Sequence, residues 1–262
     1  MNFDSVIVIP ARQGSTRFPG KPLAMIHGRQ LLLRTWLIAK AVGNVDEVFV
    51  ATDDEGIATF SRSIGAKVLM TKANCSNGSE RVYDAVKSLP QHPRVAINLQ
   101  GDAVLTPPWV IQDVVEAMKR DPLIQIATPA TRMNWAQYDL FIKSKEGGRI
   151  SGTTVVFDYQ GRALYFSKAV IPTMRDRSAK IPPIYRHIGL YGYRFDVLQK
   201  YVSLVPPEIE EAEKLEQLRA LYNGIPIQVV PVDYRGRSHW SVDNPEDIGI
   251  VEGIIEQEGE LV

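Results

Sequence analysis

Cysteine is almost absent from this sequence, and neither sign of charge is in excess. A single cysteine, Cys75, occurs among 262 residues, which excludes an internal disulfide framework and any metal site built from several cysteines. No base that would turn Cys75 into a nucleophile can be placed from the sequence, so we interpret it as an incidental thiol. The 30 basic residues balance 30 acidic ones. Nucleic-acid-binding domains usually carry a basic excess, so we expect no nucleic-acid partner.

Long apolar runs are missing as well. No window approaches the roughly 18 apolar residues that suggest a membrane-spanning helix. The first residues, Met-Asn-Phe-Asp-Ser, lack the charged region and the apolar stretch of a signal peptide. We therefore expect a cytoplasmic protein with no membrane-embedded part.

The first half of the chain has the alternating pattern of an α/β protein. With 45% hydrophobic residues, the chain can form the core of one large domain, or of a main domain with a smaller appendage. Short β-branched runs alternate with amphipathic stretches, which predicts strands at 6–9, 47–51, 67–70 and 95–99 and helices at 31–41, 57–63, 81–88 and 110–120. This alternation predicts a doubly wound, mostly parallel sheet. Ligands of such sheets bind at the carboxyl ends of the strands, so the loops after Ile9 and Leu99 are the expected binding loops.

The pattern changes from about Thr128. Three segments are β-rich, at 153–157, 162–166 and 187–193, and Gly161 fits a turn between the first two. We expect a mixed or antiparallel insertion here. The remaining predictions are a helix at 208–222 with Leu215, Leu218 and Leu221 on one side, a strand at 227–232, and a last helix at 245–258 capped by Asn244.

The loop after the first predicted strand combines cations with glycine. It holds Arg12, Arg17 and Lys21, and Gly14 and Gly20 allow the backbone to come close to a ligand. Cationic side chains and backbone amides after a strand are a common means of binding phosphate. The spacing fits neither the common lysine loop nor the dinucleotide fingerprint. These residues alone leave two interpretations open, a phosphate-binding loop or a solvated basic loop. Two further hydroxyl donors lie in it, Ser15 and Thr16.

Eight short strings in the chain, taken together, resemble one enzyme family. The first string is Ile-Pro-Ala-Arg…Ser-Thr-Arg…Pro-Gly-Lys-Pro-Leu at 9–23, and the other seven lie at 50–54, 77–81, 98–102, 163–168, 186–194, 214–221 and 242–248. Their order and content are similar to those of the 3-deoxy-manno-octulosonate (Kdo) cytidylyltransferases. The resemblance covers nearly the whole chain and implies a nucleotidyltransferase-like fold. It also implies the reaction: a sugar-acid hydroxyl attacks the α-phosphate of CTP and pyrophosphate leaves, with Mg²⁺ as cofactor, for lipopolysaccharide or capsule synthesis.

The resemblance implies a single domain of 262 residues whose three segments have different functions. Residues 1–127 would form the nucleotide-binding half, 128–240 the acceptor and dimerisation part, and 241–262 a segment with a metal ligand and a helix. Members of the family are typically homodimers, and we expect the β-rich insertion and the helix near Leu215 to contribute to the interface.

The nucleotide-binding residues implied by the resemblance lie in three strings. Arg12, Arg17 and Lys21 would neutralise the triphosphate, Ser79 would face the cytosine and Arg81 would support the nucleotide. An ordinary helix start, with Ser79 as cap and Glu80 in the first turn, is the alternative for the second string. The full expected set is Pro10, Ala11, Arg12, Arg17, Lys21, Asn77, Gly78, Ser79, Arg81 and Gln100.

Two aspartates are the expected metal ligands. Asp102 follows a predicted strand opposite the basic loop, and a carboxylate there is a natural Mg²⁺ ligand. Asp243 is the expected second ligand. Mg²⁺ keeps several waters and takes one or two carboxylates plus phosphate oxygens, so two aspartates suffice. The alternatives are a turn residue for Asp102 and a helix-start residue for Asp243. With Arg12 and Lys21, the two aspartates form the expected catalytic set.

The acceptor-binding residues are implied by the resemblance alone. His187 and Tyr191 are four positions apart, which would place them on one face of a strand; a structural His–Tyr pair is the alternative. We assign no general base to His187, because phosphoryl transfer depends mainly on positioning and charge. The expected acceptor set is Gln100, Lys168, His187, Tyr191, Glu216 and Gln217.

Three positions depart from the family pattern. Ala103 stands where the family has glutamate, Thr154 where it has lysine, and Lys168 where it has arginine. Arginine and lysine differ at a bidentate carboxylate site. The nucleotide half therefore matches better than the acceptor half. Kdo or a close analogue is the leading acceptor, with 8-amino-Kdo, a nonulosonic acid or a phosphonate as alternatives. A non-catalytic nucleotide-binding regulator is the alternative from another class.

Overall fold

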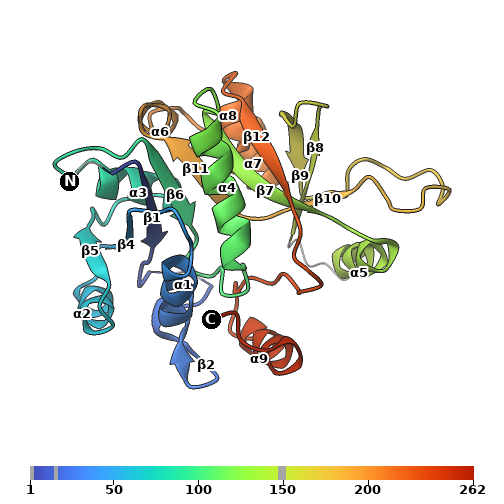
Figure 1. Ribbon diagram of the computed structural model, residues 1–262. Helices are drawn as coiled ribbons and strands as arrows, with labels where there is room; N and C mark the ends of the chain where they lie inside the picture. The colour runs from blue at the N-terminus through green and yellow to red at the C-terminus, as the bar shows by residue number, and fades with distance from the viewer. Residues whose placement is uncertain (1–2, 15–16, 147–151) are drawn as a thin grey trace.

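A computed structural model describes residues 3–14, 17–146 and 152–262 of the chain. Within these residues one ten-stranded sheet runs through the molecule, with helices on both faces (Figure 1). Its strand order is β5-β4-β1-β6-β11-β7-β10-β8-β9, and β12 also pairs with β7. The predicted α/β fold with a mostly parallel first half is confirmed.

The first half follows the predicted alternation. Four parallel strands, β1 (Ser5–Pro10), β4 (Glu47–Thr52), β5 (Lys67–Met70) and β6 (Val95–Leu99), form one side of the sheet. The helices between and after them are α1 (Leu31–Lys40), α2 (Glu55–Ser63), α3 (Gly78–Val86) and α4 (Pro108–Arg120). Pro108 stands at the first position of α4, where its missing N–H costs nothing.

The second half continues the same sheet with antiparallel strands. β11 (Leu190–Arg194) pairs antiparallel with β6 and joins the two halves, while β8 (Thr153–Phe157) and β9 (Ala163–Ser167) form an antiparallel hairpin. β7 (Ile126–Arg132) lies beside β10 (Tyr185–His187), β11 and the parallel strand β12 (Ile227–Val232). The insertion predicted from about Thr128 is thus mixed, and it extends the central sheet.

Several predicted elements differ in detail. The strand predicted at 187–193 is interrupted at Ile188 and Gly189, so it forms the end of β10 and most of β11. The helix predicted at 208–222 is wrong: α7 (Glu208–Glu213) and α8 (Leu218–Tyr222) are separate, because Lys214 takes a left-handed conformation with φ 53°. The sequence reasoning also missed α5 (Trp135–Glu146), α6 (Phe195–Val202), a 3₁₀ turn η1 (Lys21–Leu23) and the hairpin β2 (Met25–Ile26) with β3 (Arg29–Gln30).

The predicted helix cap Asn244 is wrong, and so is the alternative interpretation of Ser79 as a cap. The last helix, α9 (Asp247–Glu258), is not capped by Asn244; instead the Asp247 carboxylate accepts hydrogen bonds from the backbone N–H groups of Asp243 and Asn244, at 2.9 and 2.8 Å. At α3 the cap is Asn77, whose side chain accepts the Glu80 N–H at 2.9 Å, and not Ser79. Asn77 was expected in the nucleotide loop, so this loop also serves as the start of a helix.

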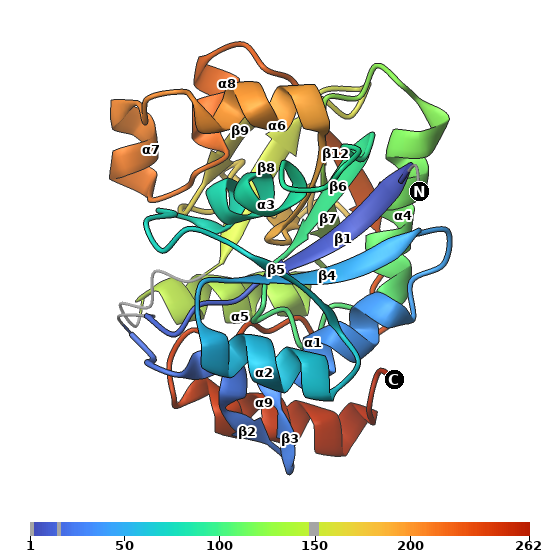
Figure 2. The same cartoon turned by 90° about the vertical axis from the view of Figure 1, so that its left-hand side faces the viewer.

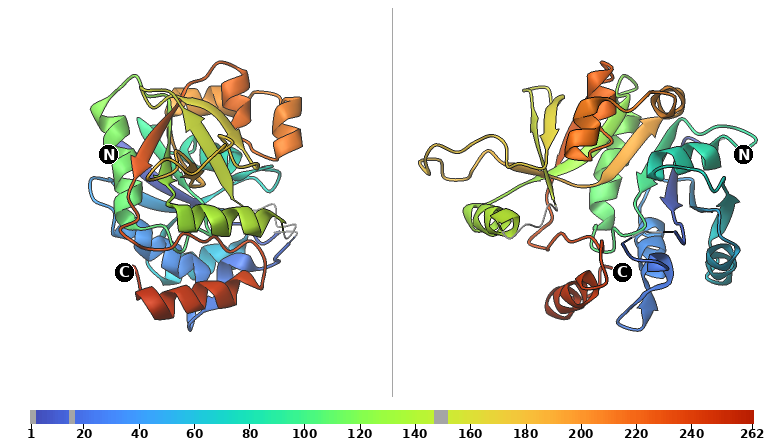
Figure 3. Two further views of the ribbon diagram at one scale, coloured as in Figure 1. Left: turned by 90° about the vertical axis from the view of Figure 1, so that its right-hand side faces the viewer. Right: turned by 180° about the vertical axis from the view of Figure 1, so that it is seen from behind.

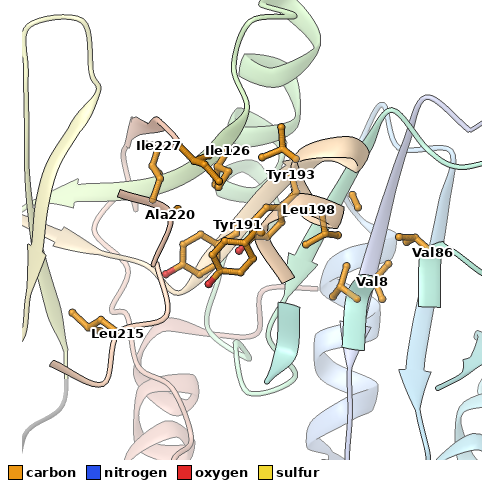
Figure 4. Packing of buried hydrophobic residues seen from close by; sticks show 14 of the residues in the cluster. Val8, Val86, Ile126, Tyr191, Tyr193, Leu198, Leu215, Ala220 and Ile227 are labelled. Atoms are coloured by element: carbon orange, nitrogen blue, oxygen red, sulfur yellow. The ribbon is translucent and has the colours of Figure 1, made fainter. Parts of the chain in front are cut away.

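The core has one layer on each face of the sheet. Alternate residues of β1 point to opposite faces, so Val6 and Val8 pack with α3 and α6 while Ile7 and Ile9 pack with α1 and α4. Figure 4 shows Tyr191 and Tyr193 of β11 packed among the first of these layers. Figure 2 shows α9 beside the small β2–β3 hairpin at one end of the molecule. In the part of the chain described, no helix is both long enough and apolar enough to cross a membrane.

Candidate active site

Two loops meet where β1 and β6 end. The strands are parallel neighbours, with Val8 opposite Asn98, so the loops that follow them leave the sheet side by side. Gly101 permits this approach, because a Cβ atom on it would lie 3.0 Å from the carbonyl oxygen of Pro10. The Thr35 hydroxyl holds the second loop by donating to the Gly101 carbonyl at 2.8 Å. The expected binding loops therefore form one surface.

Lys21 ties this surface together. Its Nζ donates to Oδ2 of Asp102 at 2.7 Å and to the carbonyl oxygen of Val242 at 2.9 Å. Both Lys21 and Asp102 are largely shielded, with 17% and 22% of their side chains exposed. Gly20, in the left-handed conformation at φ 73°, turns the backbone into η1 so that Lys21 faces inward. One lysine thus joins three segments that are distant in sequence.

Asp243 lies beside the same cluster. Its Oδ1 is 3.0 Å from Nη2 of Arg17, which is mostly exposed. Burial, and after it the negative charge of Asp102, raises the pKa of Asp243, while Arg17 and Lys21 oppose the shift. The structure therefore brings together Arg17, Lys21, Asp102 and Asp243, with each aspartate paired to a loop cation. Arg12 lies exposed in the same loop, whereas Ser15 and Thr16 lie outside the described residues.

The donor set around the two aspartates fits a hard divalent cation. Carboxylate oxygens are the ligands that Mg²⁺ prefers, and one or two of them suffice when phosphate and water complete the shell. Among the described residues, no group of three or more His, Cys, Asp or Glu side chains is placed to hold a metal by itself. Any metal here would therefore depend on a bound ligand for part of its coordination.

A buried polar network extends from the second loop to α3. Nε2 of Gln100 donates to Asn98 at 3.0 Å, and Nδ2 of Asn98 donates to the Ser79 hydroxyl at 3.3 Å. The same hydroxyl lies 3.1 Å from the Tyr193 hydroxyl and donates to Glu216 at 3.2 Å. Ser79 is fully buried, so its side chain links the two halves of the sheet. Gly78 packs against Gln100, where a Cβ would lie 2.7 Å from Nε2.

Arg81 lies inside the structure. It is buried, its Nη1 is 2.8 Å from Oδ1 of Asp53, and the same nitrogen donates to the Thr71 hydroxyl at 2.5 Å. Arg81 therefore fixes the start of α3 against the end of β4.

His187 and Tyr191 are neighbours on two strands that follow one another along the chain and both pair with β7. They lie on β10 and β11, and not on one continuous strand as predicted, yet their ring centroids are 5.5 Å apart. Nε2 of His187 is 2.8 Å from the Thr128 hydroxyl. Burial, with the positive charge of Lys168, lowers the pKa of His187 to about 3. His187 is therefore neutral in the ordinary pH range.

Glu216 is a buried carboxyl with unused hydrogen-bonding capacity. Burial raises its pKa to about 7, although Ser79 and Arg219 favour the ionised form. Among the described residues, its Oε2 and Nε2 of Gln217 have no hydrogen-bond partner. Buried polar atoms are normally paired, so these two are free to bind a polar ligand.

The break between α7 and α8 positions this pair. The left-handed Lys214 ends α7, and the Tyr201 hydroxyl donates to the Glu216 carbonyl at 2.7 Å. Arg219 makes a bidentate ion pair with Glu210, at 2.6 and 2.8 Å, which joins the two helices.

Comparison with known proteins places this arrangement in a family. The family model described as cytidylyltransferase matches residues 6–228. The chain belongs to the cytidylyltransferase family. The resemblance predicted from the eight strings is thereby confirmed. Cytidylyltransferases generally use a divalent metal ion.

The curated relatives of this cytidylyltransferase have consistent names. The chain is 55% identical over 255 residues to the 3-deoxy-manno-octulosonate cytidylyltransferase of Maricaulis maris, covering 97% of this chain and 98% of the relative. It is 37% identical to the protein of that name from Zea mays, with 96% and 80% covered. Among solved structures it matches a CMP:2-keto-3-deoxy-manno-octonic acid synthetase complexed with CTP, at TM-score 0.84 and 34% identity, with 97% and 99% covered.

The three departures from the family pattern have different surroundings. Thr154 is buried, and its hydroxyl donates to the Ala169 carbonyl at 2.7 Å and accepts the Ile171 N–H at 3.1 Å. It is therefore a structural residue in this cytidylyltransferase. Ala103 is half-buried next to Asp102, and its N–H donates to the Gln100 carbonyl at 3.0 Å. Lys168 follows β9, and its backbone N–H donates to Glu213 at 2.8 Å.

Sequence reasoning missed four polar residues of the site: Asn98, Thr128, Tyr193 and Glu213. Asn98 had a usable signal, because it is the one polar residue in the buried run Val-Ala-Ile-Asn-Leu of β6. A polar residue inside a fully buried strand must find a partner or a ligand. The other three are recruited by tertiary contacts that no local pattern predicts.

Proposed function

We propose that this cytidylyltransferase transfers CMP from CTP to the anomeric hydroxyl of a 2-keto sugar acid, Kdo or a close analogue, with release of pyrophosphate. The observation that carries the proposal is the pairing of Lys21 and Arg17 with Asp102 and Asp243 where β1 and β6 end. At this position the cations can bind a triphosphate and the carboxylates can bind a metal ion. The names of the relatives and the CTP bound to one of them support the choice of donor and acceptor. The product would serve lipopolysaccharide or capsule synthesis.

The reaction is an in-line displacement at phosphorus. The acceptor hydroxyl oxygen forms a bond to the α-phosphorus, the bond to the bridging oxygen breaks, and pyrophosphate leaves with the electron pair. The hydroxyl proton is lost to solvent. Arg12, Arg17 and Lys21 would neutralise the triphosphate. Asp102 and Asp243 would hold Mg²⁺, which supplies further charge neutralisation when bound.

The salt bridges of the site keep these groups ready. Without a ligand, each aspartate would otherwise be a half-buried charge without a partner, which is costly. Lys21 is the partner of Asp102, with Nζ 2.7 Å from Oδ2, and Arg17 is the partner of Asp243, with Nη2 3.0 Å from Oδ1. A triphosphate and a metal would offer both kinds of group stronger partners, so the loop cations would turn to phosphate as the aspartates take the metal.

The rest of the predicted set would position the substrates. Pro10, Ala11, Gly78 and Gln100 line the junction of the loops and would contact the nucleotide, and the Gln100–Asn98–Ser79 network would hold this surface rigid. Asn77 and Arg81 would act through the structure, as cap and as internal ion pair. The expected acceptor-binding residues are Gln100, Lys168, His187, Tyr191, Glu216 and Gln217.

His187 would bind the acceptor as a neutral ring. With a pKa near 3 it carries no proton to give at neutral pH, and its Nε2 already contacts Thr128 at 2.8 Å. It therefore serves as a positioning or binding group, in keeping with a reaction that needs charge and alignment more than a protein base.

A pyrophosphate-release assay tests the proposal. We expect release from CTP, Mg²⁺ and Kdo, and loss of at least about a hundredfold in kcat/KM in Asp102→Ala, because the lost interactions act in the transition state. The acceptor panel includes 8-amino-Kdo, sialic acid and simple phosphonates. No turnover of any octulosonate would exclude the proposed acceptor, and unchanged turnover in Asp102→Ala would exclude the metal assignment.

A further inference from the structure

The loop of the small β2–β3 hairpin contains a histidine at positive φ. His27 and Gly28 form this two-residue loop, with φ 44° and 71°, and Ile26 lies opposite Arg29. A type I′ turn needs positive φ at both positions, and Asn-Gly is the sequence that it favours. A residue other than glycine in this region is uncommon, and contacts with the rest of the molecule often hold it there. For His27 these contacts come from α9.

His27 contacts α9 through both its backbone and its ring. Its backbone N–H donates to Oε1 of Glu252 at 2.8 Å, and its Nε2 lies 3.0 Å from the Glu252 carbonyl oxygen. A carbonyl oxygen can only accept, so Nε2 carries a proton and donates it to this bond. The same nitrogen lies 3.5 Å from Oε1 of Glu256. The hairpin is thus bonded to one full turn of the helix.

The two glutamates benefit from a partner on this face of α9. Glu252 and Glu256 are four positions apart, so they are neighbours on the helix surface, where two like charges destabilise the helix. The last turn of α9 contains no basic residue that could offset them. The ring of His27 places an N–H donor beside both residues, so the helix and the hairpin stabilise each other.

The two bonded elements lead to opposite sides of the active site. Lys21 lies in η1, directly before the hairpin, and Asp243 lies directly before α9, whose first residue Asp247 accepts the Asp243 N–H at 2.9 Å. One small apolar cluster, which includes Ile26 and Val251, packs between the elements. Both views of Figure 3 show α9, in red, and the hairpin, in blue, at the same end of the molecule. A shift of α9 relative to the hairpin would therefore move Asp243 relative to Lys21.

The contacts of His27 involve no group that a substrate would engage. In the proposed function Arg17 and Lys21 turn to the triphosphate, so their bonds to the segment around Asp243 are given up when CTP binds. The bonds of His27 to α9 remain. Arg34 links the same hairpin to Glu260 at 2.5 Å, beyond the end of α9, so His27 holds the part of the helix that is nearer to Asp243.

We propose that His27 is a positioning residue for the transfer reaction, which fixes Asp243 relative to Lys21 by bonding the hairpin to α9. The proposal rests on the proposed function, because it concerns the geometry in which these two residues bind CTP and its metal ion. A ligand that binds best to the bonded arrangement must also favour that arrangement. CTP binding and the docking of α9 on the hairpin are therefore coupled.

His27→Asn separates the turn from the contact with α9. Asparagine is favoured at this turn position, so the variant keeps the hairpin and loses the ring. The Kd for CTP, measured by calorimetry with Mg²⁺ and no acceptor, should rise about threefold to tenfold, the value of one hydrogen bond. The acceptor KM at saturating CTP should stay within about twofold. Glu252→Met removes the bond to the His27 backbone from the helix side, so it should change the Kd in the same direction.

His92→Asn is the matched control. His92 is also exposed, and it stacks on Phe195 with 3.9 Å between ring centroids, before the start of β6 and away from the loop that follows this strand. This variant should leave the Kd for CTP unchanged.

Hydrogen exchange separates positioning from a purely structural role. Without ligand, the amides of 247–258 should exchange faster in His27→Asn than in wild type, and saturating CTP with Mg²⁺ should reverse most of the increase. Equal Kd values in His27→Asn and wild type would overturn the inference and leave the proposed function intact. A higher Kd with unchanged exchange in α9, or faster exchange that CTP does not reverse, would also overturn it. Absence of CTP binding by the wild type would instead overturn the proposed function.

Discussion

At the scale of single residues, the site depends on polar groups placed inside the core. Ser79 contacts Asn98, Tyr193 and Glu216 while fully buried. Burying such groups is costly unless they are paired, and a completed network fixes one arrangement of the surrounding elements. Glu216 is only partly paired, because one of its oxygens has no partner among the described residues. Its protonation should therefore affect stability.

We predict that Glu216→Gln reduces the loss of stability at alkaline pH. The pKa of Glu216 is raised from 4.5 to about 7 in the folded state. Between these values the folded state binds more protons than the unfolded state, so this contribution is complete below pH 4.5 and is lost as pH rises through 7. The loss amounts to roughly 3 kcal/mol. Urea unfolding without ligand at pH 5 and pH 8 should show a smaller difference in Glu216→Gln by about this amount.

A matched control is Glu208→Gln, because Glu208 lies exposed at the start of α7. It should keep the pH dependence of the wild type. The same pH dependence in wild type and Glu216→Gln would contradict the prediction.

The sequence predicts which side chains meet where two loops leave neighbouring parallel strands. Parallel neighbours place the loops after Ile9 and Leu99 together, so Lys21 and Asp102 could be expected near one another. The caps were not predictable. Asn77 and Ser79 are both good cap residues, and Asn244 is as good as any in its segment. The outcome depends on Ser79 being drawn to Tyr193, and on Asp247 accepting two backbone N–H groups.

At the scale of elements, the break between α7 and α8 is the main departure from sequence reasoning. Leu215, Leu218 and Leu221 keep helical spacing, and neither glycine nor proline interrupts the segment. The break comes from the left-handed Lys214 and from contacts with α6, through Tyr201. Since these partners are distant in sequence, periodicity alone predicts one helix. The pair α7–α8 is then held by Arg219 and Glu210.

We predict that Arg219→Met destabilises the protein by roughly 3–5 kcal/mol, because it leaves the buried Glu210 carboxylate without its partner. The two side chains are only 5% and 10% exposed. Urea unfolding measures the change. The double variant Arg219→Met/Glu210→Leu should recover most of it, since the unpaired charge is removed. If the double variant were as unstable as the single one, the loss would come from packing and not from the charge.

β7 shows a different kind of missed element. Its sequence, Ile-Ala-Thr-Pro-Ala-Thr-Arg, contains Pro129, which argues against a strand paired on both sides. In the structure Pro129 lies opposite Val230 of β12, and its carbonyl accepts the Ile188 N–H at 3.1 Å. Ile188 is also where β10 gives way to β11. The ladder is irregular at this point, which is how a proline is tolerated.

At the scale of the whole molecule, the alternation of strands and helices predicted the first half of the sheet correctly. The second half could be predicted only as mixed, because antiparallel pairing depends on partners far along the chain. β11 pairs with β6 across some 90 residues of sequence, with Tyr191 opposite Asn98. This pairing brings the acceptor half against the nucleotide half and creates the Ser79–Tyr193 contact.

We expect a homodimer formed by the β8–β9 region. Leu164 and Tyr159 are 62% and 93% exposed there, and Ile181 of the connection between β9 and β10 is 43% exposed. Exposed apolar side chains favour association. Light scattering at micromolar concentration should give a dimer for the wild type and a monomer for Leu164→Glu. Leu123→Glu, at an exposed position outside this region, should remain dimeric, and a monomeric wild type would contradict the expectation.

The ion pair between Arg17 and Asp243 joins residues 226 positions apart. Domains begin to fold from their first residues while the ribosome is still adding the last. In a nascent chain, the first strands of the sheet are synthesised long before Val242 and Asp243. The loop that holds Arg17 and Lys21 therefore lacks both the Asp243 carboxylate and the Val242 carbonyl as partners. Activity should appear only after Asp243 has left the ribosome, so products of interrupted translation would be inert toward CTP.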